Sequence, residues 1–154
     1  WVPDLPFTVI HGDLCASNIL CDSRQREIRV IDPRGDFGGR GIYGDYRYDL
    51  GKLLHSFGGL YDFIMADLFL DLSLDKSSIS WTIEVGPAQS SILDLFSKSL
   101  HQFAPTDILA VEFIEALLFL SMVPLHRESR DRQSVLFATG VEKFARFCEG
   151  QLNK

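Results

Sequence analysis

Cysteine is scarce in this chain, because its 154 residues include only Cys15, Cys21 and Cys148. Three cysteines without close pairing provide neither the spacing of a zinc site nor a disulfide framework. This usage is typical of a reducing compartment, so we expect a cytoplasmic location. The sequence also opens at Trp1 without a methionine, a basic segment or a cleavable apolar stretch. We therefore expect no secretory signal, and a natural start that lies upstream.

Positive charge is also in the minority, since 15 lysines and arginines stand against 21 aspartates and glutamates. A net charge of -6 repels a polyanionic backbone, so no nucleic-acid partner is expected. The one long apolar run, residues 108–125, contains Glu112 and Glu115 and has Pro124 near its end. Charges at that depth of a bilayer are costly, so the run predicts a buried helix of a soluble protein and no membrane insertion.

The apolar pattern predicts an α+β fold that is mainly α-helical. The chain is 46% hydrophobic and long enough for one globular core, but too short for two ordinary domains. Small β-hairpins are expected where short apolar runs flank polar turns, and a long irregular loop where glycines cluster. The expected segments are an extended run at 7–10, hairpins over 19–31 and 68–85, the loop 33–44, and helices over 46–57, 60–67, 88–103, 106–122 (with Thr106 as its cap) and 130–151.

A polar cluster with defined spacing carries the chemistry. His11-Gly12-Asp13 follows the first extended run, Asn18 comes five residues after Asp13, and Asp32 ends the predicted strand of the first hairpin. Phosphoryl transfer needs a carboxylate that orients and deprotonates an attacking hydroxyl, and oxygen ligands that hold Mg²⁺. Asp13, Asn18 and Asp32 could supply these groups, and a carboxylate with an amide oxygen makes an oxygen-only site that suits Mg²⁺ better than zinc.

The His-Gly-Asp-x-x-x-x-Asn spacing resembles the catalytic loop of the aminoglycoside phosphotransferase and choline kinase family, which are relatives of protein kinases. The resemblance implies that Asp13 is the catalytic base and that Asn18 and Asp32 are the metal ligands. It further implies that Asp49, in Gly44-Asp45-Tyr46-Arg47-Tyr48-Asp49, braces the catalytic loop by hydrogen bonds, and that His11 is a structural member of that loop. The match covers residues 1–154 but only the C-terminal, helical lobe of the family's fold.

This resemblance implies an ATP- and Mg²⁺-dependent phosphotransferase acting on a hydroxyl of an amino alcohol, sugar or aminoglycoside. The segments 31–35 and 44–49 look most like bacterial members in surface-polysaccharide synthesis. Fewer than a dozen residues precede His11, so the N-terminal, nucleotide-binding lobe with its lysine is expected to be missing. We therefore expect ATP, a small hydroxyl-bearing substrate and the missing lobe as partners, and little activity from this chain alone.

Several alternatives stay open at this stage. Asp36-Phe37-Gly38 spells the metal motif of protein kinases, but it lies in the Gly-rich loop, and a metal ligand belongs on a rigid element, which favours Asp32. Arg34 is a candidate phosphate or substrate contact, or simply a solvated or ion-paired arginine. A non-catalytic pseudokinase or regulatory module attached to another enzyme is the alternative to a kinase. A metal-dependent hydrolase ranks lower, because the chain lacks zinc-like ligand spacing. The oligomeric state is open.

Overall fold

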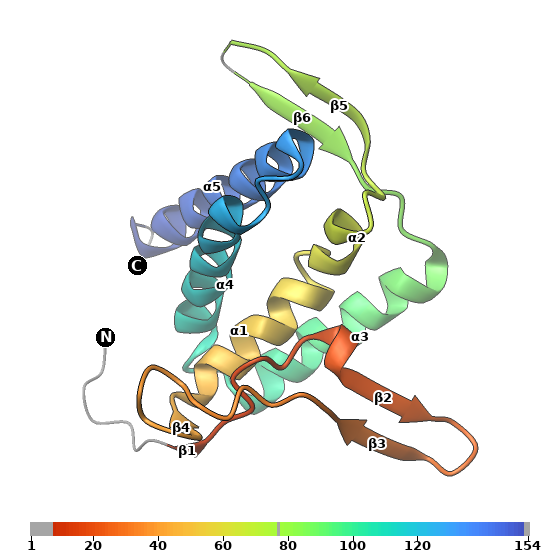
Figure 1. Cartoon of the computed structure of the whole chain (residues 1–154), viewed down its shortest axis with the longest axis vertical. Helices are drawn as coiled ribbons and strands as arrows, with labels where there is room; N and C mark the ends of the chain where they lie inside the picture. The colour runs from red at the N-terminus through yellow and green to blue at the C-terminus, as the bar shows by residue number, and fades with distance from the viewer. Residues whose placement is uncertain (1–7, 77, 153–154) are drawn as a thin grey trace.

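The structure is a computed structural model that describes residues 8–76 and 78–152. It is 54% helical and 15% strand, with small sheets only, so the expected α+β and mainly helical class is confirmed. Figure 1 shows three separate strand pairs arranged around a group of helices. The expected extended run at 7–10 and the expected hairpin over 68–85 each include one residue outside the described ones, Phe7 and Ser77, and Trp1 also lies outside them.

Each sheet consists of two antiparallel strands. The first pair joins two strands that are distant in the sequence. The other two pairs are hairpins, in which a polar turn links consecutive strands. In the first hairpin, Asp22 Oδ1 accepts the backbone N–H groups of Arg24 and Gln25 and so closes the turn. The pairs are β1 (Thr8–Val9) with β4 (Tyr43–Gly44), β2 (Ile19–Asp22) with β3 (Glu27–Val30), and β5 (Leu70–Leu74) with β6 (Ile79–Thr82).

The helices begin and end close to the predicted positions. The first is capped by Asp45, whose side chain accepts the Arg47 N–H, and is followed by Gly58 and Gly59. The bounds are η1 (Ala16–Asn18), α1 (Tyr46–Phe57), α2 (Tyr61–Met65), α3 (Pro87–Phe103), α4 (Ile108–Met122), η2 (Val123–Leu125) and α5 (Arg130–Leu152).

Helix α4 supplies the centre of the core and packs against both α1 and α5. Its Phe119 is fully buried and clusters with Ile64 of α2 and with Val135 and Leu136 of α5. Residues 108–125 are long and apolar enough to cross a membrane by length and composition, and 28% of them are buried within the structure. The run forms helix α4 and the short η2, but the predicted buried helix is only partly buried, and it exposes apolar side chains such as Leu117 and Leu125.

Two local expectations are wrong. Thr106 does not cap α4; the residue at the cap position is Asp107, and its side chain makes no capping bond. Instead the Asp107 carboxylate accepts the Tyr46 hydroxyl and lies 3.9 Å from Arg47, so a tertiary contact replaces the local one. Asp32 was placed at the end of a strand, but β3 ends at Val30 and Asp32 adopts a left-handed backbone with φ of 58°.

Candidate functional site

The loop from His11 to Asn18 is held along one face of α1. Strand β1 delivers it, and the backbone N–H of Ile10 bonds to the carbonyl of Ile42, which keeps the loop beside the N-terminal end of α1. On α1, Asp49, Lys52 and Ser56 are three and four residues apart, a spacing that aligns side chains on one helix face. All three of these side chains contact the loop, and no loop residue is shared between two of them.

Asp49 binds the start of the loop. Its Oδ2 accepts the His11 N–H at 2.7 Å, and its Oδ1 accepts the Gly12 N–H at 2.9 Å. Asp49 lies in the first turn of α1, where the helix dipole favours a negative charge. One carboxylate therefore satisfies two consecutive backbone donors of the loop, and it joins the loop rigidly to the helix.

Gly12 is the residue that permits this turn. Its φ is +75°, a left-handed value that favours glycine, and it is buried. A Cβ at this position would lie 3.0 Å from the Cβ of Arg34 and 3.6 Å from the ring of Phe37. Both the backbone conformation and the close approach of the neighbouring loop therefore require glycine here.

Asp13, the predicted base, is held from two sides. Its Oδ1 forms a 2.8 Å ion pair with Nζ of Lys52, whose side chain is only 7% exposed. The Asn18 side-chain nitrogen donates to the Asp13 carbonyl at 2.9 Å and approaches its Oδ2 at 3.4 Å. Because a carbonyl only accepts hydrogen bonds, this contact places the Asn18 amide oxygen on the side away from Asp13. The carboxylate of Asp13 remains 34% exposed and thus accessible to a ligand.

The rest of the loop also rests on α1. The backbone N–H of Ala16 donates to the Ser56 hydroxyl at 3.1 Å. Cys15 is buried beside this contact, and its Sγ lies 3.2 Å from the Ser17 hydroxyl. Cys15 therefore packs within the loop rather than presenting its sulfur to solvent.

The first hairpin brings the Asp32 segment back to the loop. The Ile31 N–H bonds to the Asn18 carbonyl at 3.0 Å, and the Ile31 carbonyl accepts from His11 Nε2 at 2.9 Å, in the tautomer that carries the proton there. The backbone N–H of Arg34 donates to the His11 carbonyl at 2.9 Å. His11 thus connects its own loop to the segment that follows β3. Asp32 is exposed and comes directly after Ile31, whose backbone N–H bonds to Asn18.

Asp36, the competing metal ligand, has a role inside the Gly-rich loop. Its Oδ1 accepts the backbone N–H of Gly41 at 2.9 Å, and Phe37 N–H bonds to the Gly41 carbonyl at 2.8 Å. The Phe37 ring packs edge-on against Tyr48 of α1, with centroids 4.6 Å apart. These contacts give Asp36 a structural function as an acceptor that closes the loop.

The oxygen-bearing side chains present here fit a hard divalent cation. Asn18 turns its amide oxygen away from Asp13, and the Asp32 carboxylate is exposed one residue beyond the Asn18 pairing. Within the part of the chain that the structure describes, no three histidine, cysteine, aspartate or glutamate side chains converge as metal ligands. Mg²⁺ commonly binds through one or two protein oxygens together with phosphates and water, and Asn18 and Asp32 are the residues here that could supply such oxygens.

Lys52 is the site residue that the sequence reasoning missed. The sequence did contain a signal for Lys52. It lies three residues after Asp49, so the two side chains share one helix face, and a loop that contacts Asp49 can also contact Lys52.

Further along the same helix, His55 lies between the rings of Tyr61 and Phe119, at centroid distances of 4.3 and 4.1 Å. Burial lowers the pKa of His55 to about 2, with a smaller contribution from Lys52, so this imidazole is neutral.

Tyr61 lies in an environment that disfavours its charged form. Burial raises the pKa of the Tyr61 hydroxyl to about 12, and the nearby charges of Asp62, Cys15 and Asp13 contribute in the same direction. The phenol is therefore protonated at neutral pH and acts as a donor or a packing group, not as a base.

No protein-family model, curated protein or solved structure matches this chain.

Proposed function

We propose that this chain is the helical lobe of an ATP- and Mg²⁺-dependent small-molecule phosphotransferase of the aminoglycoside phosphotransferase and choline kinase kind, working in the cytoplasm. The observation that carries the proposal is the loop from His11 to Asn18. It presents the Asp13 carboxylate from a backbone that Asp49 holds at two consecutive amides. A carboxylate on so constrained a loop can orient an acceptor hydroxyl, and positioning supplies most of the catalysis in phosphoryl transfer.

Within this proposal Asp13 accepts the hydrogen bond of the acceptor hydroxyl and then its proton. Lys52 and the Asn18 amide hold the carboxylate in one orientation, so the free lone pairs on its exposed side face the substrate. Arg34 is the candidate contact for a phosphate or an anionic substrate group, because its backbone is fixed to His11 and its side chain is exposed. The acceptor class stays an amino alcohol, a sugar or an aminoglycoside, with a role in bacterial surface-polysaccharide synthesis as the narrower proposal.

Asn18 and Asp32 would hold the Mg²⁺. When bound, the ion neutralises the charge of the nucleotide phosphates during transfer. The hairpin of β2 and β3 serves this site by keeping the backbone of Asn18 paired with Ile31, immediately before Asp32. The left-handed backbone of Asp32 turns the chain at this point, and the Gly-rich loop follows.

The test uses the full natural protein that contains this chain. Transfer of the γ-phosphate of ATP to a panel of amino alcohols, sugars and aminoglycosides would be measured for the parent, for Asp13→Asn and for the control Asp36→Asn. We expect Asp13→Asn to lose a factor of about 10² to 10⁴ in rate, since a positioned base contributes that much, and Asp36→Asn to lose far less. Retained turnover in Asp13→Asn would contradict the proposal.

The metal assignment has a separate test. Calorimetric titration of Mg²⁺ and nucleotide into Asp32→Ala and Asp36→Ala variants should show loss of binding in the first alone. Loss in the second alone would move the metal ligand from Asp32 to Asp36.

A non-catalytic binding or regulatory module is the second candidate. The Asp13 and Lys52 ion pair favours it, because a carboxylate that neutralises a buried lysine already has a structural role. This candidate predicts that Asp13→Asn lowers stability while the parent protein shows no phosphate transfer to any acceptor. The upstream sequence separates the two, because a strand-rich segment with a glycine loop and a lysine favours the kinase.

A further inference from the structure

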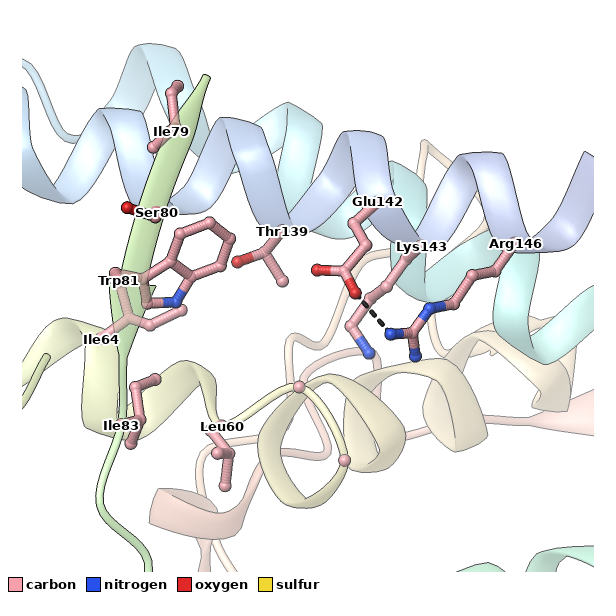
Figure 2. Close-up of a pocket in the computed structure, with 12 residues that line it drawn as sticks. Leu60, Ile64, Ile79, Ser80, Trp81, Ile83, Thr139, Glu142, Lys143 and Arg146 are labelled. Atoms are coloured by element: carbon pink, nitrogen blue, oxygen red, sulfur yellow. Dashed lines mark hydrogen bonds and ion pairs between the residues drawn. The ribbon is translucent and has the colours of Figure 1, made fainter. Parts of the chain in front are cut away.

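A cavity of about 490 Å³ lies between β6, the turn from α1 to α2, and α5 (Figure 2). None of the residues that line it belongs to the loop from His11 to Asn18. Its volume falls in the range of pockets that hold small organic molecules. The cavity is therefore a candidate site in its own right, separate from the proposed phosphotransfer site.

One side of the cavity is apolar. Trp81 of β6 stands there with Ile64 and Ile83, and Figure 2 shows its indole facing into the hollow. Trp81 and Ile83 also pack on the core cluster around Phe119, which holds this wall in place. A flat apolar group stacked on the indole would bury area on both partners.

The opposite side of the cavity is formed by three charged side chains of α5, which are Glu142, Lys143 and Arg146. Figure 2 shows the head groups of Lys143 and Arg146 reaching toward the turn after α1, across the hollow from Trp81. Arg146 is also paired with Glu142, one turn earlier on the same helix. An apolar wall thus faces a wall with two cations and one carboxylate, which we call the cationic wall because cations are in the majority there.

Lys143 is held in place before any ligand arrives. Its Nζ pairs with Glu115 Oε1 at 2.8 Å and lies 5.9 Å from the centroid of the Phe119 ring. The Glu115 side chain is only 4% exposed, and its burial raises the pKa of the carboxyl while Lys143 opposes that shift. A buried partner of this kind fixes the lysine stem, so little side-chain entropy remains to be lost on binding.

The cationic wall keeps N–H donors that its two ion pairs, Lys143 with Glu115 and Arg146 with Glu142, do not use. An ammonium has three donors and a guanidinium has five N–H groups, and within the described residues the ion pair with Glu142 occupies one N–H of Arg146. The Trp81 indole adds a further N–H on the other side of the cavity. A ligand rich in acceptor oxygens, such as a carboxylate or phosphate, complements this set.

We propose that the cavity binds a small organic anion with a flat apolar group, which stacks on Trp81 while its carboxylate or phosphate meets Lys143 and Arg146. The two walls then recognise the two ends of one molecule. The proposal does not depend on phosphotransferase activity, and direct binding tests it.

Phenyl phosphate is a suitable probe, with phenol and inorganic phosphate as the two half-ligands. The chain contains two tryptophans, so a Trp1→Phe background makes Trp81 the sole fluorescent reporter at the site. We expect a saturable change in Trp81 fluorescence with phenyl phosphate, and affinity at least about tenfold lower for either half-ligand. Equal affinity for phenol, or no saturation at millimolar probe, would overturn the proposal.

Arg146→Gln tests the cationic wall, and Arg29→Gln is its matched control. The two arginine side chains are 73% and 75% exposed, and each is paired with a nearby glutamate. We expect Arg146→Gln to weaken binding of the probe by about 1.5- to fivefold, the range of an exposed ionic contact, and Arg29→Gln to leave it unchanged. Equal effects of the two variants would overturn the assignment of the site.

Lys143 requires a paired substitution, because its removal alone leaves Glu115 buried without a partner. The double variant Lys143→Met with Glu115→Gln removes both charges and preserves similar volumes. Urea unfolding first establishes that this variant folds, and the probe titration follows. We expect at least a tenfold loss of phenyl phosphate affinity, whereas unchanged affinity would overturn the role of Lys143.

Discussion

Removal of the Asp49 carboxylate tests how the candidate catalytic loop is held. In Asp49→Ala, the N–H groups of His11 and Gly12 lose acceptors at 2.7 and 2.9 Å. A hydrogen bond to a charged group contributes about 1.5 to 3 kcal/mol. The site is only partly buried and water can replace some of each bond, so we expect a total loss of about 2 to 4 kcal/mol in the free energy of unfolding.

The assay combines urea unfolding with hydrogen exchange at the two amides. Asp131→Ala is the control, because Asp131 also lies in the first turn of a helix but is exposed. The control removes only a favourable interaction with the helix dipole, worth about 0.3 to 1 kcal/mol. Loss of protection should be confined to the amides of His11 and Gly12 in Asp49→Ala. Equal destabilisation by both variants, or intact protection of the two amides, would refute the reasoning.

Three further predictions concern the same region. Gly12→Ala should lower the free energy of unfolding by about 2 kcal/mol or more, because the new Cβ meets both backbone strain and a close neighbour. Gly35 has the same φ of +75° but open space around it, so Gly35→Ala should cost only the backbone strain of about 1 kcal/mol. Thermal unfolding measures both variants. Lys52→Met should lower the free energy of unfolding in urea by about 1 to 3 kcal/mol. This is below the full penalty of a broken buried pair, because the Asp13 side chain is 34% exposed. An unchanged unfolding midpoint would contradict the ion pair. His55 has its pKa lowered from 6.5 to about 2 in the folded protein, so the unfolded chain binds the extra proton, and stability should fall by up to about 1.4 kcal/mol per pH unit below pH 6.5. His55→Phe should reduce the slope of unfolding free energy against pH by one proton between pH 4 and 6, and an unchanged slope would show that His55 titrates in the folded state.

Elements whose signals are local were predictable. Helix α1 follows from apolar residues at three- and four-residue steps between the Asp45 cap and Gly58. The first hairpin follows from two apolar runs around a polar turn that Asp22 closes with its own side chain. In both cases the residues that define the element also make its stabilising contacts, so a short window of sequence contains the information.

Helix α4 shows where a local signal fails. Thr106 has the chemistry of a cap, yet the helix begins at Ile108 after Asp107. The Asp107 side chain is occupied by Tyr46 and Arg47, which lie some sixty residues earlier in the chain. Packing of α1 against α4 therefore determines the start of this helix, and a local window contains no trace of it.

The sequence alone determined the mainly helical α+β class, the bounds of most elements and the spacing of Asp13, Asn18 and Asp32, because these depend on neighbouring residues. The pairing of Lys52 with Asp13 and the end of the strand before Asp32 depend instead on tertiary packing. Tertiary packing also decided that a cavity forms between β6 and α5, which are far apart along the chain. Such features depend on which surfaces pack together, and packing brings together residues whose separation in sequence carries no signal.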